Sequence, residues 1–232
     1  RDGRGRPRAI ASIVRDVTEV RRAREKVDKL NRLFLGLGKD IIENVEAILK
    51  TGLELVGGRE MHYSRFQKGR LALIIAEGGS CRFSVTGDLD AHMCERVIRG
   101  GGEVIYLPDM GEAPGAEGYE VAARLGSASF LAYPVRLGSQ VIGCLSLFAE
   151  PGREYGEDEL DTVGALARII SIEEERLARE ERLKDFIDVA SHELRHPLAV
   201  MKGYALLLRE KEGELYEATR REALEAISKG VD

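Results

Sequence analysis

The alternation of apolar and polar positions divides the chain into helical ends and a central region of short strands. Apolar runs bounded by glycine or polar turn residues predict strands. Helical spacing of apolar residues predicts helices at 19–37 and from Ile41 to Leu49. A further helix is expected over 89–99, because three consecutive glycines follow it. The expected strands are 8–14, 61–66, 71–77, 104–107, 129–135 and 140–149.

A second apolar pattern follows, with alternating spacings of four and three residues, which is typical of a coiled coil or helical bundle. His192 lies two residues after a member of this seam, roughly 200° around the helix, and is therefore expected to face solvent. Pro197 cannot donate a hydrogen bond to the carbonyl of Glu193, so the helix should bend or loosen there. The seam consists of Leu183, Ile187, Ala190, Leu194, Pro197, Met201, Tyr204 and Leu208.

The same stretch contains the letters H-E-x-x-H, which permit a metal interpretation. On a helix His192 and His196 share one face and could hold zinc, with Glu193 as general base. The longer form of the motif is absent, and Arg195 places a cation between the two supposed ligands. A distant glutamate could serve as the third ligand, but nothing singles one out among the downstream residues Glu210, Glu212, Glu214 and Glu217.

The flanks of this motif favour another interpretation. The segment 186–208, FIDVASHELRHPLAVMKGYALLL, resembles the H-box of the dimerisation and phosphotransfer (HisKA) domain of sensor histidine kinases. The resemblance implies that His192 attacks the γ-phosphate of ATP and later passes the phosphoryl group to an aspartate of a response regulator. Glu193 would fix the tautomer of the imidazole and accept its proton. A homodimer and an ATP-binding kinase domain are the other implied partners.

One position departs from the family pattern. Members commonly carry Thr or Asn four residues after the phosphoacceptor, where it is linked to dephosphorylation of the regulator, and this chain has His196. The departure leaves the kinase chemistry intact and puts phosphatase activity in doubt. His196 is either a modulating residue or an exposed residue with no role.

The central region, 35–175, resembles a GAF sensor domain, most clearly in FLAYPVRLGSQVIGCLSLFAEPGREYGEDELDTVGALARII. The implied fold is α+β: an antiparallel sheet flanked by helices, with long N- and C-terminal helices leading into a truncated helical hairpin. The family binds various small molecules over one sheet face, so the ligand is unknown. The candidate ligand contacts are His92, Cys94, Tyr106 and Asp109.

The cysteines and the first of these candidates also have simpler interpretations. We favour the simpler interpretation, in which His92 is a surface residue of its helix and Cys94 is a small packing residue. Cys144 lies within an expected strand and is expected in the core, whereas Cys81 follows two glycines and is expected to be exposed.

The N-terminus and the charged connectors complete the predicted organisation. Residues 1–20 resemble the tail of a PAS domain, with a strand followed by Asp16 and Thr18, which also suit a helix cap. A helical linker covers 21–34, the GAF domain 35–175, and a coiled-coil linker with a truncated HisKA domain 176–232. We expect the ATP-binding domain to lie beyond this segment, which alone should then be inactive.

Composition and charge narrow the functional classes. The net charge of −5 does not indicate nucleic-acid binding, and no run of about 18 apolar residues predicts a membrane span. Three cysteines without CxxC spacing indicate a reducing, cytoplasmic setting. The alternative to a kinase portion is a ligand-binding GAF dimerisation module without kinase activity, and the zinc hydrolase is the remote one.

Overall fold

The computed structural model describes residues 18–67, 70–77, 80–86, 93–113, 124–210 and 217–229. These residues form two compact units, and the chain passes from the first to the second after Glu175. The elements in chain order are α1 (Thr18–Gly36), α2 (Ile41–Val56), β1 (Glu60–Gln67), β2 (Arg70–Glu77), β3 (Ser80–Thr86), α3 (Cys94–Arg99), β4 (Ile105–Leu107), the 3-10 helix η1 (Met110–Glu112), β5 (Ser129–Leu137), β6 (Gln140–Ala149), α5 (Glu157–Glu210) and α6 (Glu217–Lys229).

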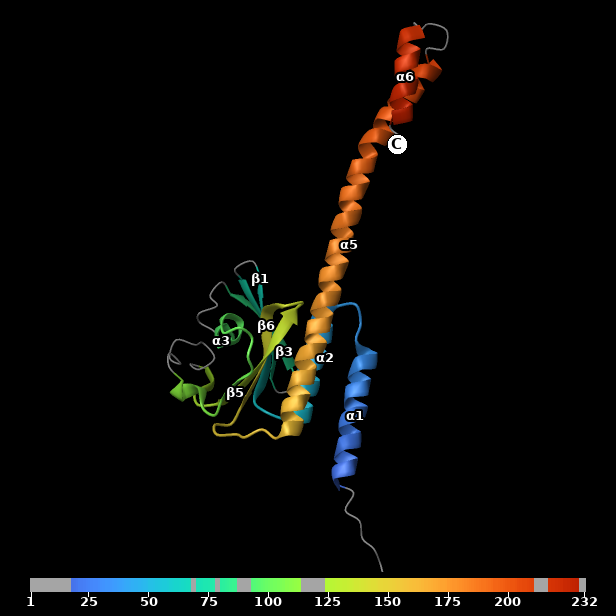
Figure 1. Cartoon of the computed structure of the whole chain (residues 1–232). Coiled ribbons are helices and arrows are strands. Elements are labelled where there is room, and N and C mark those ends of the chain that lie inside the picture. The colour runs from blue at the N-terminus through green and yellow to red at the C-terminus, as the bar shows by residue number, and fades with distance from the viewer. Residues whose placement is uncertain are drawn as a thin grey trace, which may run out of the picture. The chain divides into compact units, whose positions relative to one another are not determined.

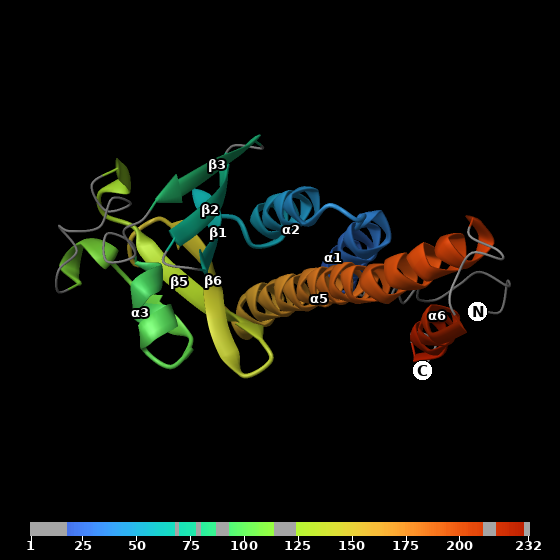
Figure 2. The ribbon, with the colours of Figure 1, turned by 90° about the horizontal axis from the view of Figure 1, so that it is seen from above.

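The first unit is built on a six-stranded antiparallel sheet of order β3-β2-β1-β6-β5-β4. Helix α2 and the first part of α5 lie against one face, and α3 lies against the other (Figures 1 and 2). This arrangement confirms the predicted α+β fold with an antiparallel sheet flanked by helices.

Alternation along the strands gives the sheet two separate apolar cores, because successive side chains point to opposite faces. On β5, Leu131 packs toward α2 and α5, whereas Phe130 and Ala132 pack toward α3. Strand β6 alternates in the same way, with Leu145 and Leu147 on the first face and Cys144 and Phe148 on the second. Both faces of these strands are therefore buried, as their nearly continuous apolar sequence requires.

Glycines allow two close features of the sheet. Gly138 has a φ of 62° in the turn that joins β5 to β6, and the ladder closes at Leu137 and Gln140. The connection between the strands expected at 129–135 and 140–149 is thus a two-residue hairpin turn. A Cβ at Gly143 would lie 2.0 Å from the carbonyl oxygen of Ser64, so only glycine lets β1 and β6 approach here.

The structure also corrects and extends the predicted elements. Strand β3 was not predicted, although it pairs with β2 along its whole length. The strand expected at 8–14 and the start of the helix expected over 89–99 lie outside the described residues. Helix α5 runs from Glu157 through Pro197 to Glu210, so the first unit and the phosphoacceptor segment share one helix. The expected loosening after His192 stays a prediction.

Candidate functional site

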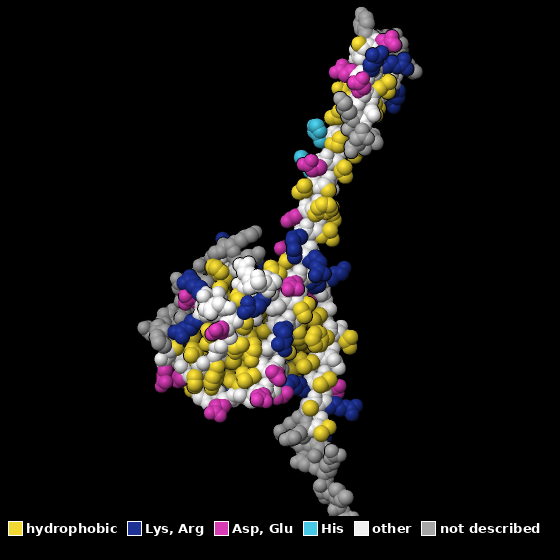
Figure 3. Space-filling model, viewed as in Figure 1, with side chains coloured by type: hydrophobic (Ala, Val, Ile, Leu, Met, Phe, Trp, Pro, Cys, Tyr) yellow, Lys and Arg dark blue, Asp and Glu magenta, His cyan; other side chains and the backbone are white. Residues whose placement is uncertain are grey.

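The histidine pair of α5 lies on the surface of the second unit. His192, Glu193 and His196 are all exposed. Figure 3 shows histidine side chains standing out from this part of the helix beside a row of apolar ones. The described residues contain no group of three or more potential metal ligands, so the two histidines have no third partner for zinc there. This geometry suits a side chain that a partner protein must reach.

The predicted seam of α5 is open over its first half. Leu183, Ile187 and Leu194 are exposed, whereas Met201, Tyr204 and Leu208 are half-buried. A row of exposed apolar side chains at four- and three-residue spacing is unfavourable in water unless another helix covers it. The segment therefore has the surface of a helix that pairs with a partner.

The predicted ligand contacts of the first unit do not form one site. Cys94 is buried in the core between α3 and the sheet, beside Cys144, and His92 lies outside the described residues. A hydrogen bond with Cys144 and burial raise the pKa of the Cys94 thiol, so it stays protonated. This is where a packing residue would lie, and the ligand role of Cys94 stays a prediction. Cys144 is in the core as expected, but Cys81 is half-buried and packs toward α2, contrary to the prediction.

Tyr106 and Asp109 have structural partners. The hydroxyl of Tyr106 donates to the carbonyl oxygen of Arg153 at 2.6 Å, and its ring lies edge-on to Tyr155. Its neighbours in β4 pack toward α3, so strand alternation turns Tyr106 to the opposite face. Asp109 caps η1 by accepting from the amide of Gly111, and its hydrogen bond from Ser127 lowers its pKa. Asp109 therefore holds a loop, and the ligand roles of Tyr106 and Asp109 stay predictions.

The face of β1 that points toward α3 carries a buried charged cluster, which the sequence analysis did not predict. Glu60 and His62 are buried side by side, with His62 Nε2 2.6 Å from Glu60 Oε2. Arg124 donates hydrogen bonds to both carboxylate oxygens of Glu60. Arg82 Nη2 lies 3.9 Å from Glu60 Oε1. Burial alone would raise the pKa of Glu60, but hydrogen bonds from Arg124 and His62 outweigh it and lower the pKa to about 2. Burial lowers the pKa of His62, which is therefore neutral at pH 7 and donates to Glu60.

The opposite face of β1 holds the last buried turn of α5 in this unit. Glu174 is 1% exposed, accepts a hydrogen bond from Tyr63 at 2.6 Å and pairs with Arg65 Nη2 at 3.0 Å. Burial and the Glu174 charge raise the pKa of Tyr63 well above its ordinary value, so the phenol keeps its proton. We call Tyr63, Arg65 and Glu174 the exit clamp, because α5 leaves the first unit directly after it.

A second polar contact joins the same turn of α5 to α2. The side-chain amide of Asn44 donates to Glu173 Oε2 at 2.6 Å and to the carbonyl oxygen of Gly38 at 3.0 Å. Its oxygen accepts from the amide of Gly38 at 2.7 Å. Asn44 therefore connects the segment between α1 and α2 with the exit of α5.

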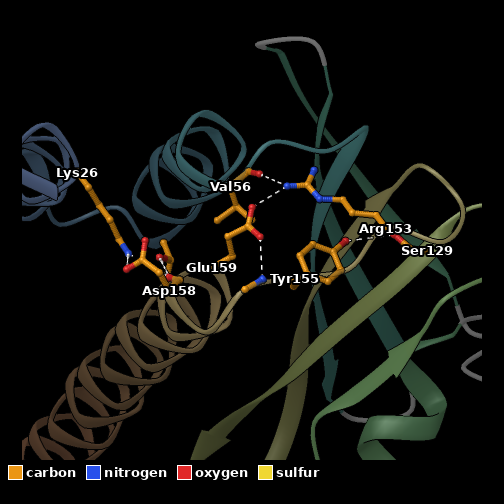
Figure 4. A network of polar contacts seen from close by, with 9 residues as sticks. Lys26, Val56, Ser129, Arg153, Tyr155, Asp158 and Glu159 are labelled. Atoms are coloured by element: carbon orange, nitrogen blue, oxygen red, sulfur yellow. Dashed lines mark hydrogen bonds and ion pairs between the residues drawn. The ribbon is translucent and has the colours of Figure 1, made fainter. Parts of the chain in front are cut away.

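The start of α5 is held by a third network (Figure 4). Arg153 donates to the carbonyl oxygen of Val56 at 2.6 Å and to Glu159 at 2.8 Å, and its guanidinium lies over the Tyr155 ring. Lys26 of α1 pairs with Asp158 at 2.5 Å. The start of α5 is thus tied to α1 through Lys26 and to the end of α2 through Arg153.

The sequence of β1 explains why its two clusters were missed. EMHYSRFQ alternates charged or polar residues with apolar ones, which is typical of a strand with one face in water. The strand is instead third in the sheet, so helices cover both faces and its polar residues must find partners inside. The interior position of β1 depends on the order of the strands in the sheet, which the sequence pattern does not reveal.

Comparison with known families agrees with this architecture. The family model for the GAF domain matches residues 39–172, and the model for the His Kinase A (phospho-acceptor) domain matches residues 182–232. The chain belongs to the GAF domain family, and a HisKA phospho-acceptor domain follows. This order is that of a sensor histidine kinase fragment. Neither match covers the predicted PAS tail, which stays a prediction. No curated protein sequence matches the chain.

Solved structures show the same fold at low sequence identity. The chromophore-binding domain of an unusual bacteriophytochrome from R. palustris has a TM-score of 0.55 and 11% identity, over 72% of this chain and 64% of that chain. The phycoerythrobilin-bound GAF domain of a cyanobacterial phytochrome has a TM-score of 0.54 and 13% sequence identity, over 71% of this chain and 100% of that chain. The GAF domain of a phosphoenolpyruvate-protein phosphotransferase from Coxiella burnetii has a TM-score of 0.54 and 14% sequence identity, over 69% of this chain and 98% of that chain. This chain thus spans just under two thirds of the phytochrome fragment.

No helix in the described part of the chain is both long and apolar enough to cross a membrane.

Proposed function

We propose that this chain is the sensory and phosphoacceptor portion of a two-component sensor histidine kinase, with His192 as the phosphorylated residue. The observation that carries the proposal is the exposed His192 within the HisKA match, on a helix that begins in the GAF domain. Cytoplasmic sensing by the GAF domain, whose ligand is unknown, is part of the same proposal.

The proposed chemistry is a phosphoryl transfer in two steps. An unprotonated ring nitrogen of His192 attacks the γ-phosphorus of ATP, which an ATP-binding domain holds, and the bond to the β–γ bridging oxygen breaks as ADP leaves. The remaining N–H proton passes to Glu193. An aspartate of a response regulator then takes the phosphoryl group and restores the histidine.

The open side of α5 supports this exchange of partners. His192 is exposed and shares its face with His196 one turn later, so both an ATP-binding domain and a regulator can approach. Within the described residues Glu193 makes no hydrogen bond to His192, so its base role requires a rotamer that forms in the complex. We assign His196 a role in modulating dephosphorylation of the regulator, because it lies on the same exposed helix face as His192.

The test supplies the ATP-binding domain of a histidine kinase in trans with γ-labelled ATP. Wild-type chain and the matched control His196→Gln are expected to take up label, and His192→Gln is expected to take up none. Label that persists in His192→Gln would contradict the proposal. Absence of label in every variant would favour the GAF dimerisation module without kinase activity.

A further inference from the structure

A cavity of about 190 Å³ lies beneath the first turns of α2, over strands β1, β2 and β3 of the first unit. A cavity of about 150 Å³ holds one benzene ring, so this one can hold a ring with a small substituent. The three residues of the exit clamp form its polar lining. Its apolar lining consists of Ile41, Ile42, Val45, Ala72, Ile74 and Phe83.

The register of the sheet places the lining side chains on the face that α2 covers. Tyr63 of β1 pairs with Ile74 of β2, and Arg65 pairs with Ala72. Paired residues on neighbouring strands point to the same face, and Tyr63 and Ile74 both pack in the core beneath α2 and α5. The predicted ligand residue Cys94 packs in the other core. The cavity therefore lies on the opposite face of the sheet from Cys94.

The rim of the cavity is apolar and open to water, whereas its base is buried. Ile42 is 46% exposed and Phe83 is 57% exposed. Tyr63 and Glu174 are only 3% and 1% exposed. An apolar molecule that covered the two rim side chains would remove apolar surface from water, which favours binding.

Arg65 provides the cavity with a hydrogen-bond donor. Its Nη2 atom pairs with Glu174 at 3.0 Å, but its Nε atom is buried and makes no hydrogen bond within the described part of the chain. A buried N–H group without an acceptor is unfavourable, and an acceptor atom on a bound molecule would satisfy it. Because Glu174 already balances the charge of Arg65, the lining favours a neutral ligand over an anion.

We propose that this cavity binds a small neutral molecule that is mainly apolar and carries a carbonyl oxygen, which accepts a hydrogen bond from Arg65 Nε. The inference rests on the sensory role proposed for the GAF domain and gives the chemical class of the sensed molecule. The bound molecule would contact all three residues of the exit clamp, and so the last buried turn of α5.

The test is a titration of the full 232-residue chain with acetophenone, followed through the NMR signals of the isoleucine methyl groups. The methyl signals of Ile41, Ile42 and Ile74 are expected to shift. Those of Ile98 and Ile105, which pack on the α3 face, should stay in place. Benzoate is expected to bind at least about fivefold more weakly than acetophenone, because its charge would lie beside the buried Glu174.

Two variants separate the apolar part of the site from the polar part. Ala72→Leu fills the cavity and should weaken acetophenone binding at least about tenfold, because atoms in a close-packed site cannot overlap. Ala47→Leu is the matched control and should stay within about twofold of wild type, since Ala47 lines a separate hollow between α1 and α2.

Arg65→Lys keeps a cation beside Glu174 but has no Nε donor. It should weaken acetophenone at least about fivefold and ethylbenzene, which has no acceptor, by less than about twofold. The methyl spectrum of each variant shows whether it is folded.

Four results would overturn the inference. Absence of acetophenone binding would show that the cavity is not a site for this class of molecule. Shifts at Ile98 and Ile105 instead would place the ligand on the α3 face. Tighter binding of benzoate than of acetophenone would exclude a neutral ligand, and equal effects of Arg65→Lys on acetophenone and ethylbenzene would remove the proposed hydrogen bond. No readout involves phosphate, so failure of His192 labelling and failure of this binding are separate results.

Discussion

Single residues on β1 show how this sheet tolerates charge in its interior. Glu60 remains ionised because Arg124 and His62 supply its hydrogen bonds, and His62 remains neutral because burial disfavours its cation. The pKa values of Glu60 and His62 in the folded protein are therefore lower than those of the same groups in the unfolded chain. Acid should weaken the first unit in two stages.

The first stage gives a pH prediction for His62. Its folded pKa lies below 6.5, so between pH 6.5 and that lower pKa the unfolded chain binds more protons. The free energy of unfolding should then fall as the pH falls below about 6.5, with a limiting slope of about 1.4 kcal/mol per pH unit. Urea unfolding from pH 7.5 to 5 measures this slope.

His62→Gln should lose that slope, while the exposed His196→Gln control should keep it. An unchanged slope in His62→Gln would show that the buried imidazole is not the group responsible. The second stage belongs to Glu60, whose contribution is complete above pH 4.5 and is lost as the pH falls toward about 2.

At the scale of elements, α5 is attached to the first unit at both ends of its packed segment. Arg153 and Lys26 hold the start, and the exit clamp and Asn44 hold the end. Breaking the exit clamp should destabilise the protein more than breaking the contacts at the start of α5. The reason is that Glu174 is a buried charge whose partners are Tyr63 and Arg65.

We therefore predict that Glu174→Ala lowers the free energy of unfolding by about 3 kcal/mol, since it leaves the Arg65 charge without its carboxylate. Tyr63→Phe removes one hydrogen bond and should cost about 1 kcal/mol. Glu180→Gln is the control, because its pair with Arg176 lies on the surface and should contribute under about 1 kcal/mol. Urea unfolding provides the measurement, and equal losses for Glu174→Ala and the control would contradict the clamp.

The elements differ in how well the sequence predicts them. Strands β5 and β6 are long apolar runs on either side of a glycine turn, and they lie where periodicity places them. Strand β3 was missed because SCRFSVT contains few apolar residues and derives its place from pairing with β2. Helix α5 continues from the first unit into the second, which the residue ranges of the predicted domains did not indicate.

The sites divide in the same way. His192 and the open seam follow from spacing along one helix, which is local information. The Glu60 cluster and the exit clamp join residues more than sixty positions apart in sequence, and they arise only when the strand order is known. The direction of the Tyr106 side chain likewise depends on which face of β4 meets α3, which the sequence alone does not tell.

At the scale of the whole molecule, we propose that two copies of the chain pair along the seam of α5 that begins at Leu183. Leu194 is 62% exposed on the seam, and Val189 is 61% exposed away from it. We predict that Leu194→Asp raises the dimer dissociation constant at least about tenfold, because a charge then enters an apolar seam. Val189→Asp should leave it within about threefold, since rim charges contribute little to affinity. Sedimentation of both variants checks this, and equal weakening by both would place the interface elsewhere.

The central claim is that His192 carries the phosphoryl group. The direct measurement is fragmentation mass spectrometry, at neutral to alkaline pH, of the chain phosphorylated by an ATP-binding domain in trans. The account predicts one phosphoryl group on His192, lost after brief acid treatment, as expected of a phosphoramidate. Acid-stable phosphate, or phosphate on any other residue of wild-type chain, would contradict it.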